Sequence, residues 1–289
     1  MSGVAMAGPS RVSLPNTLQK TLETPSGRTF LVQISWPLQW SEHDRIKEGE
    51  CPVIYIADGN ALFLMATEAS WRREIGPHYS GGGIVVAVGY VLDGRVFDRK
   101  RGYDLTPLAP GVSDEFLDFI LGPVNLIVAE CFPNKIISRQ ALYGHSYGGL
   151  FALYVLLTRP GGFNLFVASS PSAWFQGDWI IREAEKFAKS PPSSAPDQKQ
   201  RPSLMFFYGS LEQYPKRWHD ESHEHFEKRE QSCAERKVSE NTTALQKCLQ
   251  QSGKLEAVTI QEYVGEDHGT VMACSLSRSL TTFFEEWPL

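Results

Sequence analysis

The fold of this chain is decided by residues 140–151, which read Gln-Ala-Leu-Tyr-Gly-His-Ser-Tyr-Gly-Gly-Leu-Phe. The first four residues are apolar and strand-like, and an apolar, helix-like run follows the glycines. A strand, Gly-x-Ser-x-Gly and a helix form a nucleophile elbow, a tight turn that exposes a serine hydroxyl at the carboxyl end of a sheet. A Cβ at Gly144 or Gly148 is expected to collide with a neighbouring strand or helix, and Gly149 lets the helix begin close to the sheet. The pattern therefore predicts that Ser146 is a hydrolase nucleophile.

Strand-like and helix-like segments alternate along the rest of the chain, which is typical of an α/β architecture. Strands are expected at 28–36, 52–57, 83–91, 140–143, 163–169, 203–208 and 255–264. Helices are expected at 61–73, 150–157, 178–189 and 270–287, and at 114–132 with a break near Gly122-Pro123. With the elbow, this order predicts an α/β-hydrolase fold, a mostly parallel sheet with helices on both faces.

The domain organisation is expected to be simple. We interpret residues 1–24 as an N-terminal extension and residues 25–289 as a single domain. Ser, Pro, Gln and Lys dominate residues 190–202, which predicts a flexible loop. Residues 214–254 are strongly charged and have few aliphatic side chains, so we expect an exposed, cap-like helical excursion before the last strand.

Composition narrows the class of protein. A net charge of -5 gives no global basic surface for nucleic acid or anionic membrane. No apolar stretch is long enough to span a bilayer, and the first 14 residues lack a basic region followed by an apolar core. The five cysteines are odd in number and contain no Cys-x-x-Cys pair, which favours reduced thiols. These features predict a cytoplasmic enzyme that binds neither nucleic acid nor membrane. They leave the oligomeric state open.

The catalytic base is predicted from chain order, which in this fold runs serine, acid, histidine. Only His268 sits in a loop directly after the final strand and before a C-terminal helix. The remaining histidines precede the elbow (His43 and His78), lie inside it (His145) or belong to the charged excursion (His219, His223 and His225).

The acid should come from the loop that follows the strand at 203–208. Glu212 lies there, three residues past Gly209. Asp267, Asp178 and Asp220 are alternatives, and a dyad of serine and histidine remains open. Asp267 is disfavoured because a sequence neighbour's carboxylate rarely reaches the Nδ1 of the histidine.

An oxyanion hole requires two preorganised N–H donors. One is expected to be the backbone N–H of Tyr147, the residue after the nucleophile. The second is expected from the turn after the strand at 52–57, where Gly59 and Asn60 adopt unusual backbone angles at little cost.

No metal or organic cofactor is predicted. His219 and His223 share a helix face, but charge covers every face of that stretch, as in a solvated helix. No Gly-x-x-x-x-Gly-Lys-Ser/Thr loop is present to bind a nucleotide.

Four motifs in this order give the chain a family resemblance. They are Val-Ile-Tyr-Ile-Ala-Asp-Gly-Asn-Ala-Leu-Phe at 53–63, Arg-Gly-Tyr-Asp-Leu-Thr-Pro at 101–107, the elbow at 144–151 and Ser-Ser-Pro-Ser-Ala-Trp at 169–174. Over about residues 25–285 the chain resembles the siderophore-esterase branch of the esterase D-like α/β-hydrolases. That branch includes bacterial salmochelin and enterobactin esterases and fungal esterases that open ester-linked hydroxamate siderophores, and the fungal members are the more similar.

The resemblance implies a serine esterase for siderophores of the fusarinine or triacetylfusarinine type, acting in intracellular iron release. It implies Ser146 as nucleophile and His268 as base, and it places Asp58 and Arg101 at the site as substrate-binding residues. Trp174 is expected to form an apolar wall at the mouth, although core packing is an equal alternative. Two other interpretations stay open: a carboxylesterase or S-formylglutathione hydrolase of the same fold, and a binding module without catalysis.

Overall fold

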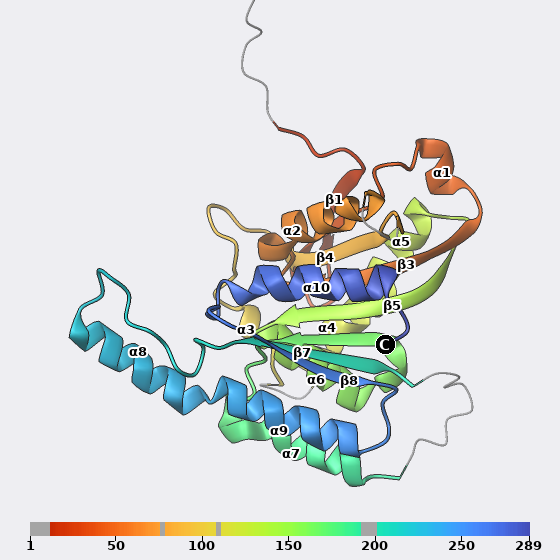
Figure 1. Cartoon of the computed structure of the whole chain (residues 1–289). Coiled ribbons are helices and arrows are strands. Elements are labelled where there is room, and N and C mark those ends of the chain that lie inside the picture. The colour runs from red at the N-terminus through yellow and green to blue at the C-terminus, as the bar shows by residue number, and fades with distance from the viewer. Residues whose placement is uncertain (1–11, 76–78, 108–110, 192–200) are drawn as a thin grey trace, which may run out of the picture.

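An eight-stranded sheet runs through the centre of the molecule, as Figure 1 shows. The computed structural model describes residues 12–75, 79–107, 111–191 and 201–289. The strands are β1 (Thr17–Glu23), β2 (Thr29–Ser35), β3 (Gly49–Ala57), β4 (Ile84–Tyr90), β5 (Lys135–His145), β6 (Leu165–Ser169), β7 (Ser203–Gly209) and β8 (Val258–Tyr263).

The strands lie in the order β1-β2-β4-β3-β5-β6-β7-β8. β2 pairs antiparallel with both β1 and β4, and every neighbouring pair from β4 across to β8 is parallel. Parallel strands end at a common edge, so the loops that follow β3, β5, β6, β7 and β8 gather there, where ligands of open α/β sheets bind. The predicted mostly parallel sheet is confirmed.

Helices cover both faces of the sheet (Figure 1). They are α1 (Glu42–Ile46), α2 (Gly59–Trp71), α3 (Arg101–Leu105), α4 (Val112–Phe119), α5 (Asn125–Cys131), α6 (Tyr147–Thr158), α7 (Phe175–Lys189), α8 (His223–Arg236), α9 (Val238–Gln251) and α10 (Val271–Glu285). Helices α2 and α10 pack on one face, and α4, α5, α6, α7 and α9 pack on the other. None of the described helices combines the length and hydropathy needed to cross a membrane.

Strand β3 shows how one continuous apolar run supports both layers. Val53, Tyr55 and Ala57 belong to the core beneath α4 to α7, whereas Ile54 and Ile56 belong to the core beneath α2 and α10. Side chains of a strand alternate between faces, so a strand covered on both sides has to be apolar at every position. Burying each Val or Ile side chain contributes about 1.5–3 kcal/mol, which holds the end of β3 firmly in place.

Strand β1 was not predicted, because its residues were assigned to the N-terminal extension. It pairs with β2 from Thr17 opposite Ser35 to Glu23 opposite Thr29. Its sequence, Thr-Leu-Gln-Lys-Thr-Leu-Glu, is mostly polar because it lies at the sheet edge with no residue fully buried. The rest of the proposed extension up to residue 11 lies outside the described residues, as do residues 192–200 of the predicted loop.

The predicted break near Gly122-Pro123 is present as a change of helix type rather than a gap. Residues Ile120–Val124 form a π-helical turn between α4 and α5. Proline has no N–H to donate and its ring crowds the preceding turn, so a wider turn accommodates it.

Residues 214–254 form two helices in different environments. α8 has no buried residue and projects from the body of the molecule (Figure 1). α9 packs against α7 and buries Val238, Leu245 and Leu249. The expected exposed excursion is therefore correct for α8 and wrong for α9. The few aliphatic residues of α9 fall seven and then four positions apart, on one helix face, and that suffices to dock it.

Candidate active site

Ser146 occupies a sharp turn between β5 and α6. Its backbone angles are φ 59° and ψ −115°, outside the helical and strand regions. The turn is held by two backbone hydrogen bonds, from Ser146 N–H to Ser169 C=O at 2.9 Å and from Leu150 N–H to Ser146 C=O at 3.0 Å. This strand, turn and helix have the geometry of a nucleophile elbow.

The three glycines of the elbow do not contribute equally. A Cβ on Gly144 would lie 1.9 Å from the Gly148 carbonyl oxygen, and one on Gly149 would lie 2.9 Å from the Ser169 carbonyl oxygen. These two glycines let helix α6 start against the sheet, as predicted. A Cβ on Gly148 would approach Asp58 Oδ2 only to 3.4 Å, an ordinary contact, so the predicted collision at Gly148 is wrong.

His268 and Glu212 meet at the ends of β8 and β7. His268 Nδ1 lies 2.6 Å from Glu212 Oε2. The other carboxylate oxygen of Glu212 accepts hydrogen bonds from Ser170 Oγ at 2.6 Å and from the Gly209 N–H at 2.7 Å. The Glu212 side chain is 1% exposed, whereas that of His268 is 43% exposed. A buried carboxylate with both oxygens bonded fixes the orientation of the imidazole and leaves its Nε2 for the cavity.

The alternative acids lie elsewhere. Asp267 Oδ1 accepts from the backbone N–H groups of Gly269 and Thr270, so it holds the turn that precedes α10. Asp178 accepts a 3.4 Å hydrogen bond from an amide on α9, and Asp220 bonds His219 on an exposed loop. Among the described residues, Glu212 is the carboxylate that contacts His268.

Ser146, Glu212 and His268 line one cavity of about 380 Å³ at the carboxyl edge of the sheet. Ser172, which was not predicted, also lies there, and its hydroxyl is 3.2 Å from the Ser146 hydroxyl. The Ser172 N–H donates to the Ser146 carbonyl at 3.1 Å. Nothing in the residue types singled out Ser172, because its position depends on the loop after β6.

The predicted oxyanion-hole residues lie at the starts of two helices. Tyr147 begins α6, and Gly59 and Asn60 begin α2 after Asp58, which has a left-handed backbone with φ 60°. The Asn60 side chain is engaged with Tyr90, donating to its carbonyl at 2.8 Å and accepting from its N–H at 2.7 Å. Within Asn60, the side-chain amide is therefore occupied, and the backbone N–H is the group that is available as an oxyanion donor. Helix N-termini present such N–H groups with a favourable dipole.

Arg101 and Asp58 bind each other. Arg101 Nε donates to Asp58 Oδ1 at 2.7 Å, its terminal nitrogen pairs with Oδ2, and it also donates to the His145 carbonyl at 3.2 Å. Burial raises the pKa of the Asp58 carboxyl, and the guanidinium opposes that rise. Neither side chain is among the residues that line the cavity. Through the His145 carbonyl the pair braces the turn at Ser146, and the contact of Asp58 and Arg101 with substrate stays a prediction.

Replacing Arg101 with alanine is expected to lower the free energy of unfolding by roughly 2–3 kcal/mol, because it leaves the buried Asp58 carboxylate unpaired. The value is below that for a fully buried pair, since the Arg101 side chain is 13% exposed. Urea unfolding would measure the loss, with exposed Arg99→Ala as the matched control from the same basic run. Equal stability of the two variants would contradict this account of Arg101.

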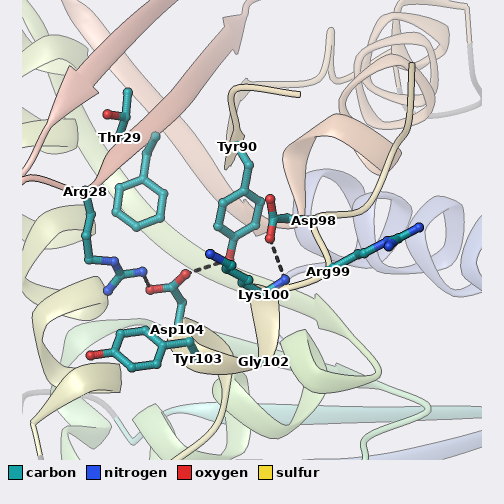
Figure 2. A pocket seen from close by; sticks show the side chains of 10 residues that line it. Arg28, Thr29, Tyr90, Asp98, Arg99, Lys100, Gly102, Tyr103 and Asp104 are labelled. Carbon is teal, nitrogen blue, oxygen red and sulfur yellow. Dashed lines mark hydrogen bonds and ion pairs between the residues drawn. The ribbon is translucent and has the colours of Figure 1, made fainter. Parts of the chain in front are cut away.

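A second hollow of about 610 Å³ lies beside α3 (Figure 2). Arg28 pairs there with Asp104, and its guanidinium lies 5.0 Å from the ring centroids of both Phe30 and Tyr103. The Tyr90 hydroxyl donates to Asp104 Oδ2 at 3.1 Å. Although larger than the first cavity, this hollow is lined by no serine, cysteine or histidine among the described residues. Its contacts anchor α3, from which Arg101 reaches the elbow.

The charged excursion forms the far wall of the first cavity. Trp218, Arg229, Cys233 and Arg236 line it from that segment, and Trp174 lines it from the loop before α7. Trp174 lies at this cavity, and its role as an apolar wall stays a prediction, whereas the five excursion residues, Val238 of α9 included, were not predicted. Their charged surroundings are typical of a solvated helix, so the sequence does not distinguish the side of α8 that faces the cavity.

No metal centre is evident among the described residues: no three His, Cys, Asp or Glu side chains there are grouped to hold an ion. Of the histidines in the excursion, His219 bonds Asp220 at 2.5 Å on the exposed surface.

Known proteins that are similar to this chain are esterases and siderophore hydrolases. A family model described as "Putative esterase" matches residues 26–266. The siderophore triacetylfusarinine C esterase of Aspergillus fumigatus is 48% identical over 287 residues, which cover 97% of each chain. The siderophore enterobactin esterase of Emericella nidulans is 39% identical over 266 residues, covering 86% of this chain and 87% of that protein. The solved structure of siderophore hydrolase EstB from Aspergillus nidulans superposes with a TM-score of 0.92 at 47% identity, covering 98% of this chain and 99% of that one.

Proposed function

The chain belongs to this esterase family of α/β-hydrolases, and on that premise we propose that it is a serine esterase that cleaves ester bonds of a siderophore of the triacetylfusarinine type. The observation that carries the proposal is a single cavity lined by Ser146, His268 and Glu212, in a chain similar over its whole length to fungal siderophore esterases.

In the proposed reaction His268 Nε2 takes the Ser146 proton while Glu212 holds Nδ1. The serine oxygen attacks the ester carbonyl, and the tetrahedral intermediate collapses to an acyl-enzyme with the proton passing to the leaving alcohol. Water, activated at the same nitrogen, then hydrolyses the acyl-enzyme. The Tyr147 N–H and an N–H from Gly59 or Asn60 are the donors proposed for the oxyanion. No metal or organic cofactor takes part in this scheme.

Ester cleavage has a simple consequence for iron. A tethered siderophore holds its second and third chelating arms at high effective concentration, and opening an ester removes that advantage. We place the reaction in the cytoplasm, after uptake of the ferric complex. The five unpaired cysteines favour a reducing compartment.

The cavity wall supplied by the excursion suits a large polar ester. Trp174 and Trp218 offer flat apolar surface, and each carries a guanidinium over its ring, Arg236 at 5.3 Å and Arg229 at 4.4 Å. Arg229 is neutralised by Glu221 at 2.6 Å, and Arg229 holds the pKa of that carboxyl down at about 2. Arg236 has no ion-pair partner in the described part of the chain. We propose that it donates to carbonyl or hydroxamate oxygens of the substrate.

Arg236→Gln is therefore expected to lower kcat/KM for ferric triacetylfusarinine C about tenfold, the value of one charge-assisted hydrogen bond. Hydrolysis of p-nitrophenyl acetate should stay within about twofold of wild type, because that ester is too small to reach Arg236. Lys228→Gln is the matched control, since Lys228 is on the same helix but pairs with Glu224 outside the cavity. An unchanged ratio of the two activities in Arg236→Gln would remove Arg236 from substrate binding.

The substrate class is tested by comparing kcat/KM for ferric triacetylfusarinine C, S-formylglutathione and p-nitrophenyl acetate. The proposal predicts that the siderophore is the best of the three. A preference for S-formylglutathione would instead favour the thioester hydrolase of the same fold. Absence of labelling by a fluorophosphonate would favour a binding module.

A further inference from the structure

Behind His268, four polar side chains form a continuous buried chain that the catalytic scheme does not use. They are Tyr143 and His145 of β5, Ser169 of β6 and Ser275 of α10. We propose that this chain is a positioning network that holds His268 in register with Ser146 and Glu212. The inference rests on the proposed function and adds non-contact residues to the machinery of the same site.

The sheet register brings the first three residues together. His145 and Ser169 are direct partners across β5 and β6, and Tyr143 lies two residues before His145 on the same face. α10 packs on that face and places Ser275 against them. All four side chains are buried, at 3% exposure or less.

The hydrogen bonds join end to end. The Tyr143 hydroxyl is 2.8 Å from Ser275 Oγ, Ser275 Oγ is 2.8 Å from Ser169 Oγ, and Ser169 Oγ is 3.1 Å from His145 Nδ1. If each hydroxyl donates toward the next group, Ser275 and Ser169 each give one bond and accept one, Tyr143 is the first donor, and Nδ1 is the final acceptor. His145 then carries its proton on Nε2.

The His145 ring packs against the catalytic histidine. The rings of His145 and His268 are 4.6 Å apart between centroids and are tilted by 43° to one another, so the two side chains are in direct contact. Burial, followed by the neighbouring His268 and Arg101, holds the pKa of His145 well below its usual range. A neutral imidazole has one nitrogen that accepts a hydrogen bond and one that donates, and this is the form of His145 that the network requires.

His268 needs such support because it sits between β8 and α10 with its side chain 43% exposed. Glu212 restrains only Nδ1, and the contact with the His145 ring supplies a second restraint on the imidazole. A misplacement of about 1 Å costs on the order of a hundredfold in rate, and buried networks of this kind hold such geometry. His145 is therefore a positioning residue, while His268 remains the residue that touches the reacting atoms.

The test measures kcat and KM for p-nitrophenyl acetate in Ser169→Ala, Ser275→Ala, His145→Leu and His145→Gln. Rates are normalised to active sites titrated with a fluorophosphonate. We expect kcat to fall about tenfold in the two serine variants and up to a hundredfold in His145→Leu, with KM unchanged. Gln places a donor and an acceptor at about the spacing of the imidazole nitrogens, so His145→Gln should recover most of the loss.

Ser279→Ala is the matched control, because Ser279 is a buried serine one turn along α10 that bonds only the Ser275 carbonyl. It should keep wild-type kcat. Wild-type kcat per active site in Ser169→Ala and Ser275→Ala would overturn the network, and so would a Gln variant no better than the Leu variant. If His145→Leu does not fold, the proposed network is tested by the kcat values of Ser169→Ala and Ser275→Ala against that of Ser279→Ala. A wild type that neither reacts with fluorophosphonate nor cleaves esters would instead defeat the proposed function itself.

Discussion

Replacing Ser146 with alanine is expected to lower kcat by on the order of a million-fold, the scale found when a serine-hydrolase nucleophile is removed. The Ser146 hydroxyl sits on the sharp turn of the elbow, at φ 59°, which is the position that presents a nucleophile in this fold. The side chain contributes little packing, and alanine has the same Cβ, so stability should change by less than about 0.5 kcal/mol.

Ser172→Ala is the matched control for this variant. Its hydroxyl is 3.2 Å from Ser146 Oγ and lines the same cavity. The proposal predicts that Ser172→Ala keeps activity within about tenfold, the value of one neutral hydrogen bond. Steady-state rates with p-nitrophenyl acetate, together with fluorophosphonate labelling, measure both variants. More than a tenth of wild-type activity in Ser146→Ala would mean that another group is the nucleophile.

Glu212→Gln is expected to lower kcat roughly a thousandfold or more, because an amide in place of the carboxylate favours the wrong imidazole tautomer. Gln can still accept from Ser170 and Gly209, so the loop should keep its structure. The loss should therefore appear in kcat with little change in the thermal midpoint.

Asp267→Asn separates Glu212 from its rival. Asp267 lies next to His268 in sequence but bonds the backbone of residues 269 and 270 in the turn before α10. It should leave kcat nearly unchanged and mainly affect stability. A silent Glu212→Gln with a damaging Asp267→Asn would make the acid assignment wrong. If neither matters, the site works as a dyad of Ser146 and His268.

Much of the site could be predicted because the chain order of this fold is strict. Ser146 follows β5, Glu212 follows β7 and His268 follows β8, and parallel strands bring those three loops to one edge. Strands β3 and β4 could also be predicted from their apolar runs, because a strand that is buried on both faces is apolar at nearly every position.

The parts that were missed depend on packing rather than local pattern. β1 is polar because it lies at the sheet edge, and α9 docks through only three aliphatic residues. The cavity wall from α8 is charged, so its sequence resembles that of any solvated helix. The resemblance placed Arg101 and Asp58 at the site, and the structure adds that they pair with each other.

The central claim is that this cavity opens siderophore esters through Ser146. The most direct measurement is mass spectrometry of ferric triacetylfusarinine C incubated with wild-type protein and with Ser146→Ala. With wild-type protein, the account predicts that the mass of the siderophore rises by one water as the first ester opens and that fragments follow as further esters are cleaved. With Ser146→Ala it predicts no change in mass. An intact siderophore after incubation with wild-type protein whose Ser146 still reacts fully with fluorophosphonate would contradict it.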